Sequence, residues 1–200
     1  MTIGIAVSGP GAGLAAFRAL AAVEKVTRGA IGGFVSFAVI TDEGKLERAE
    51  TQRGGTATLF TDGESTGTPP PLKVSQAPLA VLMSSGPDRP APLSQFTPAH
   101  IASGLVTGHR LPNVGFSGRL APNLALLERL GRGEDAKHAT SVVLDAYPDA
   151  DAGLIGLDLD GHIGLGNTVF AGRRKDLGMA LIETAMGSAG ILHNAIHPIH

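Results

Sequence analysis

The spacing of apolar residues changes along the chain, and it predicts helices in some segments and strands in others. Leu14, Phe17, Leu20 and Val26 fall on one face of a helix over residues 14–27, because positions three and four apart share a face. Similar spacing predicts further helices over residues 94–108, 123–130, 134–146 and 176–186.

Short apolar runs between turn residues predict strands. These runs lie at residues 2–7, 33–40, 56–60 and 77–86, and residues 45–50 return from a turn with polar side chains alternating outward. Residues 152–159 and 162–170 flank an Asp-Gly pair, which is typical of a two-residue hairpin turn. The stretch 61–74, rich in glycine and proline, is expected to be a surface loop.

Two segments of the chain resemble each other. Within residues 22–33 and 141–153, positions 120 residues apart align without a gap, with Val23 matching Val143 and Gly33 matching Gly153. Each segment leads into an apolar strand, a turn with Asp and Gly, and a return strand. Internal duplication and chance similarity both stay open. Duplication predicts two halves, about residues 1–75 and 76–200, whose hairpins lie side by side in one sheet.

Composition limits the class of protein. Of 200 residues, 43% are hydrophobic and 17% charged, which suits a single domain over residues 1–200 with a sizeable core. The net charge of −2 gives no electrostatic basis for binding nucleic acid or an anionic membrane. With no cysteine, no signal-peptide pattern and no membrane-spanning apolar stretch, we expect a soluble cytoplasmic protein. Glycine-rich packing and spare apolar surface are compatible with a homodimer.

Three glycines, Gly9, Gly11 and Gly13, stand between the first strand and the first helix. Free backbone N–H groups at such a junction could hold an anion, which makes Gly11 and Gly13 candidate substrate-binding residues. The spacing matches neither the dinucleotide fingerprint nor a P-loop, so no cofactor is expected. The alternative is a tight structural turn.

His109, Arg110 and Asn113 follow the segment that is predicted to be helical up to Gly108. His109 could act as an acid or base near neutral pH. Arg110 could bind a carboxylate with two hydrogen bonds, and Asn113 could orient either partner. The alternative is that His109 and Arg110 cap the end of the helix.

Polar residues also gather where the strand after the Asp-Gly turn ends. Asn167 and Thr168 are candidates for the nucleophile or for polarising a substrate carbonyl, and Arg173 and Arg174 could bind a small anion. The alternative is a polar turn that leads to the last helix, with Asp176 as its N-cap.

Thr2 is a further catalytic candidate. Methionine before threonine is commonly removed, and an amino-terminal threonine carries both a nucleophile and a base.

The histidines near the end of the chain suggest a metal site only by their spacing. They are His193, His197 and His200. Pro198 breaks any helix that would align them, and no carboxylate lies among them, so no metal site is expected.

The stretch "VVLDAYPDADAGLIGLDLDGHIGLGNT" resembles N-terminal nucleophile (Ntn) hydrolases of the isoaspartyl peptidase and glycosylasparaginase type. In that family a helix leads into Pro-x-Phe-Asn-Ala-Gly, an apolar strand, an Asp-Gly turn and a return strand. Here Pro148 and Gly153 match the motif, while Ala150 replaces its Phe and Asp151 its Asn. The family's internal Gly-Thr cleavage site has no counterpart, so the resemblance carries over no catalytic residue. Thr2 could take the place of the nucleophile only if the fold resembles the shorter Ntn enzymes, whose chains begin at that residue.

These observations predict an α+β fold with a mostly antiparallel sheet covered by helices, and the resemblance implies an Ntn-like sandwich. The function that fits best is hydrolysis of a small anionic amide or lactam. A non-catalytic module that binds a small anionic metabolite would use the same residues, and an assembly subunit is a third possibility.

Overall fold

The computed structural model describes residues 1–27, 30–110 and 119–194. Its α-helices are α1 (Ala12–Thr27), α2 (Thr56–Leu59), α3 (Leu72–Ser75), α4 (Pro122–Gly131) and α5 (Ala136–Ala146). Its strands are β1 (Thr2–Ser8), β2 (Phe34–Ile40), β3 (Leu46–Gln52), β4 (Thr61–Asp62), β5 (Ser65–Thr66), β6 (Leu79–Ser85), β7 (Ala99–His100), β8 (Gly104–His109), β9 (Gly153–Leu157), β10 (Ile163–Asn167), β11 (Leu177–Thr184) and β12 (Gly187–Asn194). Short 3-10 helices lie at Leu93–Phe96 and Ala171–Arg173.

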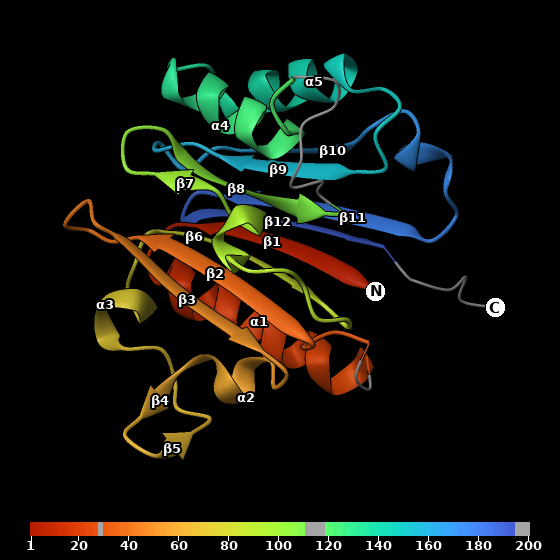
Figure 1. Cartoon of the computed structure of the whole chain (residues 1–200). Helices are drawn as coiled ribbons and strands as arrows, with labels where there is room; N and C mark the ends of the chain where they lie inside the picture. Colours follow the sequence, from red (N-terminus) through yellow and green to blue (C-terminus); the bar gives the residue numbers. More distant parts are fainter. Residues whose placement is uncertain (28–29, 111–118, 195–200) are drawn as a thin grey trace.

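Two antiparallel sheets stack between two layers of helix (Figure 1). The larger sheet has the strand order β11-β12-β1-β6-β2-β3, and the smaller has the order β10-β9-β8-β7. Helix α1 covers the outer face of the larger sheet, and α4 and α5 cover the outer face of the smaller one. The expected α+β class, with antiparallel sheets covered by helices, is therefore confirmed.

Each interface between layers has its own apolar cluster. Leu20 of α1 packs with Ile3 and Phe37 of the larger sheet. Val81 and Ile155 belong to the cluster between the two sheets. A third cluster joins α4 and α5 to the smaller sheet and reaches round to β2 and β6. Because aliphatic side chains fill most of these layers, polar side chains buried among them stand out.

Local sequence signals explain the ends of the helices. The side chain of Asp135 accepts hydrogen bonds from the backbone N–H groups of Lys137 and His138, both at 3.0 Å, and so caps α5. Pro122 occupies the first turn of α4, where its fixed φ suits a helix and no N–H is needed. The helices that were predicted near 14–27, 123–130 and 134–146 are confirmed.

Two segments that were predicted to be helical are strands. Residues 94–108 contain β7 and most of β8, and Gly104 has φ +117°, which a helix cannot accommodate. Residues 176–186 form β11 and the turn that leads to β12, with which β11 pairs along its whole length. In both segments apolar residues are mixed with small and polar ones without a strict period of 2 or 3.6, so spacing alone could not separate helix from strand. Conversely, part of the predicted strand at 56–60 forms the short helix α2.

The hairpins differ from the predictions in two respects. Residues 158–162 connect β9 to β10, so the Asp-Gly pair lies within a longer loop than the two-residue turn expected. The hairpins of the two similar segments, β2–β3 and β9–β10, lie in different sheets. The prediction that they lie side by side in one sheet is therefore wrong.

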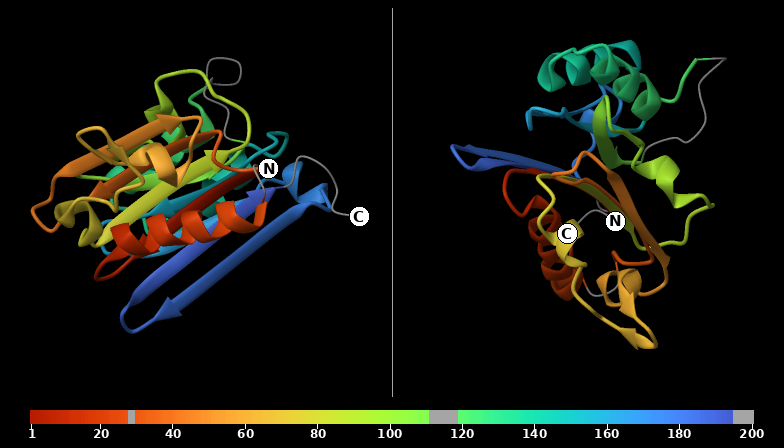
Figure 2. Two further views of the ribbon diagram at one scale, coloured as in Figure 1. Left: turned by 90° about the horizontal axis from the view of Figure 1, so that it is seen from below. Right: turned by 90° about the vertical axis from the view of Figure 1, so that its left-hand side faces the viewer.

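The β11–β12 hairpin projects beyond the layer of helices (Figure 2). β11 forms the outer edge of the larger sheet. Four apolar side chains of this hairpin are exposed: Met179, Leu181, Ile182 and Met186. Among the described residues, no helix is long and apolar enough to cross a membrane.

The two sheets approach each other most closely where backbone meets backbone. A Cβ atom placed on Gly4 of β1 would lie 2.4 Å from the carbonyl oxygen of Gly108 in β8. Next to this contact, the hydroxyl of Thr107 donates a hydrogen bond to the carbonyl of Leu82 in β6, at 2.8 Å. These contacts fix how β8 lies across β1 and β6.

Substitution of Gly4 by alanine should therefore separate the sheets. We expect the free energy of unfolding to fall by about 1–3 kcal/mol, the usual cost of overpacking a close-packed core, measured by urea denaturation. Gly172→Ala is the matched control, because nothing lies within 4 Å of its Cβ position. It should change stability by less than about 0.5 kcal/mol. Equal stability of the two variants would contradict the close contact.

Candidate functional site

Thr2, the first residue of β1, faces the layer between the two sheets. Ile3 and Ile5 pack in the cluster that includes α1, whereas Ala6 belongs to the cluster between the sheets and Gly4 meets the backbone of β8. Because side chains alternate along a strand, Thr2 lies on the same face as Gly4 and Ala6. Its side chain is almost fully buried.

His109, the last residue of β8, faces the same layer from the opposite sheet. Leu105 lies in the cluster between the sheets, and Thr107 bonds to the carbonyl of Leu82 in the larger sheet. Alternation along β8 then directs His109 to that side as well. Its side chain is completely buried.

The two residues lie at the same end of the stacked sheets. Gly4 of β1 lies against Gly108 of β8. Thr2 is two residues from the first glycine, and His109 directly follows the second. The sequence-predicted candidates Thr2 and His109, more than 100 residues apart in the chain, are thus brought to one region.

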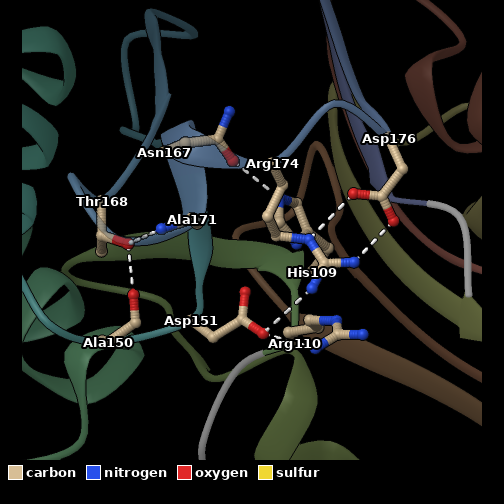
Figure 3. A network of polar contacts seen from close by, with 9 residues as sticks. All are labelled: His109, Arg110, Ala150, Asp151, Asn167, Thr168, Ala171, Arg174 and Asp176. Carbon is tan, nitrogen blue, oxygen red and sulfur yellow. Dashed lines mark hydrogen bonds and ion pairs between the residues drawn. The ribbon is translucent and has the colours of Figure 1, made fainter. Parts of the chain in front are cut away.

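His109 is held by Asn167, the last residue of β10. Its Nε2 lies 2.6 Å from the side-chain oxygen of Asn167, as Figure 3 shows. Both residues pair in register with Gly153 of the intervening strand β9. A Cβ atom on Gly153 would lie 2.4 Å from the His109 ring and 2.6 Å from the Asn167 oxygen, so this contact requires glycine between them.

The hydrogen bond sets the protonation of His109. The Asn167 oxygen accepts, so Nε2 carries the proton and Nδ1 presents a lone pair. This Nδ1 is buried and has no hydrogen-bond partner among the described residues. Burial lowers the pKa of His109 below its ordinary value of 6.5, although the bond to Asn167 opposes the change. At neutral pH His109 is therefore an uncharged acceptor.

Charged side chains surround this pair (Figure 3). Arg110 forms an ion pair with Asp151, and Arg174 lies 3.5 Å from the same carboxylate. Arg174 also binds Asp176 with two hydrogen bonds, of 2.9 and 2.5 Å. This contact lowers the pKa of Asp176. Both arginines are thus already bound to carboxylates, and their role as clamps for a substrate carboxylate stays a prediction.

The amino group that begins the chain lies near these charges. Burial lowers the pKa of the Met1 amine, and the positive charges of Arg110 and Arg89 lower it further. Asp176 acts in the opposite direction but less strongly. The potential at the start of β1 is therefore net positive.

The side chain of Thr168 is hydrogen-bonded to the backbone of two neighbouring segments. Its hydroxyl donates a hydrogen bond to the carbonyl of Ala150 and accepts one from the N–H of Ala171, at 3.2 Å (Figure 3). Because both functions of the hydroxyl are occupied, Thr168 fastens the loop after β10, and its role as a nucleophile stays a prediction.

Of the other predicted substrate-binding residues, Gly11 and Gly13 lie apart from this cluster. Arg173 is exposed, and Asn113 falls outside the described residues. Gly11 and Gly13 follow the opposite end of β1 from Thr2, and the N–H of Gly13 is bonded to the carbonyl of Ala77 at 3.2 Å. The glycine-rich junction is thus a tight structural turn, and its predicted anion site is not carried further.

Sequence reasoning missed several residues of the site. Asp176 was taken for a helix cap, and Arg89 and Asn194 were passed over. Asn194 pairs in register with Thr2 from the neighbouring strand β12. If residues 187–194 had been predicted as a strand, the alternation of side chains would have placed Asn194 on the same face as Leu192. Leu192 lies in the cluster between the sheets.

One group of potential metal ligands lies elsewhere. Ligand atoms of Asp135, Asp158 and His162 lie within 4.8 Å of one another. Asp135 caps α5, and Asp158 accepts hydrogen bonds from the N–H groups of Ala136 and His162, at 3.3 and 2.9 Å. These hydrogen bonds join α5 to the β9–β10 loop, so the three residues have a structural role at this junction.

Burial of neutral His109 should make stability depend on pH. Its pKa is lower in the folded than in the unfolded chain, so the unfolded chain binds the proton more readily. The free energy of unfolding should therefore fall as the pH drops below about 6.5. His109→Gln should reduce this slope, as measured by urea denaturation between pH 5.5 and 8. His138→Gln, at an exposed position, is the control and should keep the wild-type slope.

Comparison with known sequences gives a family but no activity. Residues 2–200 match a family described as a domain of unknown function (DUF6963). No curated protein matches the chain. Since the match spans the described site as well as both sheets, the chain belongs to the DUF6963 family.

Proposed function

We propose that the protein hydrolyses a small anionic amide or lactam, with Thr2 as its nucleophile once Met1 is removed. The observation that carries the proposal is the position of Thr2. It begins a central strand and faces the inter-sheet layer at the end where His109 is buried. The resemblance of the stretch around residues 140–168 to Ntn hydrolases, and an Ntn-like sandwich as the finer description of the fold, belong to the same proposal.

The proposed reaction has two steps. The Thr2 amine takes the proton of its own hydroxyl, Oγ bonds to the amide carbon, and the carbonyl electron pair moves to oxygen. When the carbonyl re-forms, the C–N bond breaks and the leaving nitrogen takes the proton from the ammonium group. Water then adds to the resulting ester and gives one proton to a base. When this adduct collapses, the C–Oγ bond breaks and Oγ takes that proton back, which restores Thr2. The product leaves as a carboxylic acid that ionises to a carboxylate.

The surroundings favour the neutral amine that this step requires. Directly before β1, burial and the charges of two arginines lower the pKa of the Met1 amino group. An unperturbed α-amino group already titrates near 8. The same forces acting on the amine of Thr2 would leave it unprotonated in a larger fraction of molecules at neutral pH.

His109 and Asn167 fit the second step. The lone pair on Nδ1 of His109 can accept a proton from the attacking water. Asn167 acts through His109 by holding its tautomer, so it is a positioning residue. The net positive potential from Arg110 and Arg89 supports the choice of an anionic substrate.

Intact-mass measurement and substitution of Thr2 test the proposal. The purified native protein should lack the mass of Met1. Hydrolysis of carboxylate-bearing amides and lactams, such as glutamine and 5-oxoproline, is followed by mass spectrometry in H₂¹⁸O. Thr2→Ser should retain activity, and Thr2→Ala should reduce it at least about a thousandfold.

The matched control is Thr140→Ala. Thr140 is equally buried, and its hydroxyl has no partner within the described ranges. It lies in α5, however, which packs on the outer face of the smaller sheet. This variant should keep wild-type activity. Retained Met1 would contradict the role of Thr2. Binding of the same compounds without turnover would favour the alternative, a binding module for a small anionic metabolite.

We also propose that the protein forms a homodimer through β11. This eight-residue edge strand exposes Met179 and Ile182 on opposite faces, each at 62%, and exposed apolar edges tend to pair with another strand. Antiparallel pairing of two copies about Met179 would place Leu177 opposite Leu181 of the second copy. Lys175 would lie opposite Glu183, which already pairs with Lys137 of its own chain at 2.8 Å.

Lysine at both apolar positions should prevent this pairing. We expect Met179→Lys/Ile182→Lys to sediment as a monomer in analytical ultracentrifugation, where the wild-type protein sediments as a dimer. Leu72→Lys is the control, because Leu72 is also exposed, at 71%, but lies on α3. A monomeric wild-type protein, or a dimer that survives both lysines, would rule out this interface.

A further inference from the structure

Asn194 lies beside Thr2 on the same face of the larger sheet. The two residues are partners in the antiparallel register of β12 and β1, so their Cβ atoms are about 4.5–5.5 Å apart. Leu192, two residues earlier in β12, lies in the cluster between the sheets. Asn194 therefore faces the same layer as Thr2, and it is only 1% exposed.

The carboxamide of Asn194 has no partner in the part of the chain that the structure describes. Neither its Oδ1 nor its Nδ2 makes a hydrogen bond, although both atoms are buried. Leaving a buried amide unsatisfied is costly, and nearly all such groups in folded proteins are paired. Ser85, which flanks Thr2 on the other side, donates its hydroxyl to the carbonyl of Pro87 at 3.2 Å. Of the two strand neighbours of Thr2, Asn194 is therefore the one whose side chain is unsatisfied within the described residues.

A ligand amide is the chemistry that satisfies both atoms at once. An asparagine side chain presents an N–H donor and a carbonyl acceptor side by side in one plane. It forms two parallel hydrogen bonds only with a group that offers an acceptor and a donor on the same edge. Primary carboxamides and lactams have that arrangement. An open-chain secondary amide is almost always trans, so its N–H and C=O point in opposite directions.

We propose that Asn194 binds the amide that Thr2 attacks, and that the protein therefore selects primary carboxamides and lactams over peptide bonds. The selection rests on the function proposed for Thr2. Nδ2 donates to the carbonyl oxygen and Oδ1 accepts the N–H on the same edge. As Oγ of Thr2 bonds to the carbon, an electron pair moves to the carbonyl oxygen. This oxygen still accepts the hydrogen bond from Nδ2–H, which stabilises its developing negative charge.

Binding of three small amides to the full chain tests this selection without requiring turnover. The probes are 2-pyrrolidinone, N-methyl-2-pyrrolidinone, which lacks the N–H, and N-methylacetamide, which is trans. Titrations of ¹⁵N-labelled Thr2→Ala protein are followed by NMR at the side-chain NH₂ signal of Asn194 and at the backbone amide of residue 194, which the variants below retain. We expect 2-pyrrolidinone to bind roughly tenfold more tightly than either of the other two probes, which is the usual effect of one lost hydrogen bond.

Variants of Asn194 give the second readout. Asn194→Asp keeps the size of the side chain, but its ionised form only accepts hydrogen bonds. Asn194→Ala removes both groups. Either variant should abolish the preference, so that 2-pyrrolidinone binds within about twofold of N-methylacetamide. Ser85→Ala, on the other flank of Thr2, is the control and should keep the preference for 2-pyrrolidinone. Thermal unfolding and the amide spectrum report whether each variant is folded.

The outcomes separate this inference from the proposed function. Equal affinity for the three probes, or an unchanged preference in both folded Asn194 variants, would overturn the role of Asn194. Hydrolysis that depends on Thr2 could then still be observed. Selective binding lost in the Asn194 variants, together with no turnover of any amide by the wild-type protein, would support this binding site and refute the proposed hydrolysis.

Discussion

The contact between the backbones of Gly4 and Gly108 determines where every other part of the site lies. It lets β8 approach β1 with no side chain between them, and the bond from Thr107 to Leu82 fixes the alignment. The ends of the two strands then bring Thr2 and His109 into the same layer. A side chain at either glycine would move one sheet relative to the other, because close-packed interiors transmit such strain.

Burying polar groups within this layer costs free energy, and only some of these groups have hydrogen-bond partners. Asn167 satisfies one nitrogen of His109, and bare Gly153 between them makes this contact possible. Nδ1 of His109 and both polar atoms of Asn194 stay without partners among the described residues. An apolar core would be more stable at these positions. Their presence at one end of the sheets, beside Thr2, fits a place that a polar ligand fills.

The sequence predicted the architecture better than the site. Helices α1, α4 and α5 carried clear periodicity, capping or proline signals, and the layered α+β class followed from them. His109 and Asn167 were identified as candidates by residue type. Their contact depends on pairing through β9, which a single sequence does not encode locally. Asn194 was hidden because the preceding segment was predicted to be helical, so that β12, and its register with Thr2, had no place in the prediction.

Asp151 places an ionised carboxylate beside the buried pair of His109 and Asn167. Asparagine at this position would be neutral, whereas an ionised aspartate in a half-buried place needs a cation nearby. Arg110 and Arg174 both supply one. Arg110 does so from a left-handed backbone conformation, φ 49°, which costs a residue with a side chain about 1 kcal/mol. The two arginines are thus neutralised locally by Asp151 and Asp176. The field of Arg110 still reaches the Met1 amine, which precedes β1, and there with Arg89 it outweighs the opposing charge of Asp176. The carboxylate of Asp151 therefore holds Arg110 in place while the start of β1 stays positive.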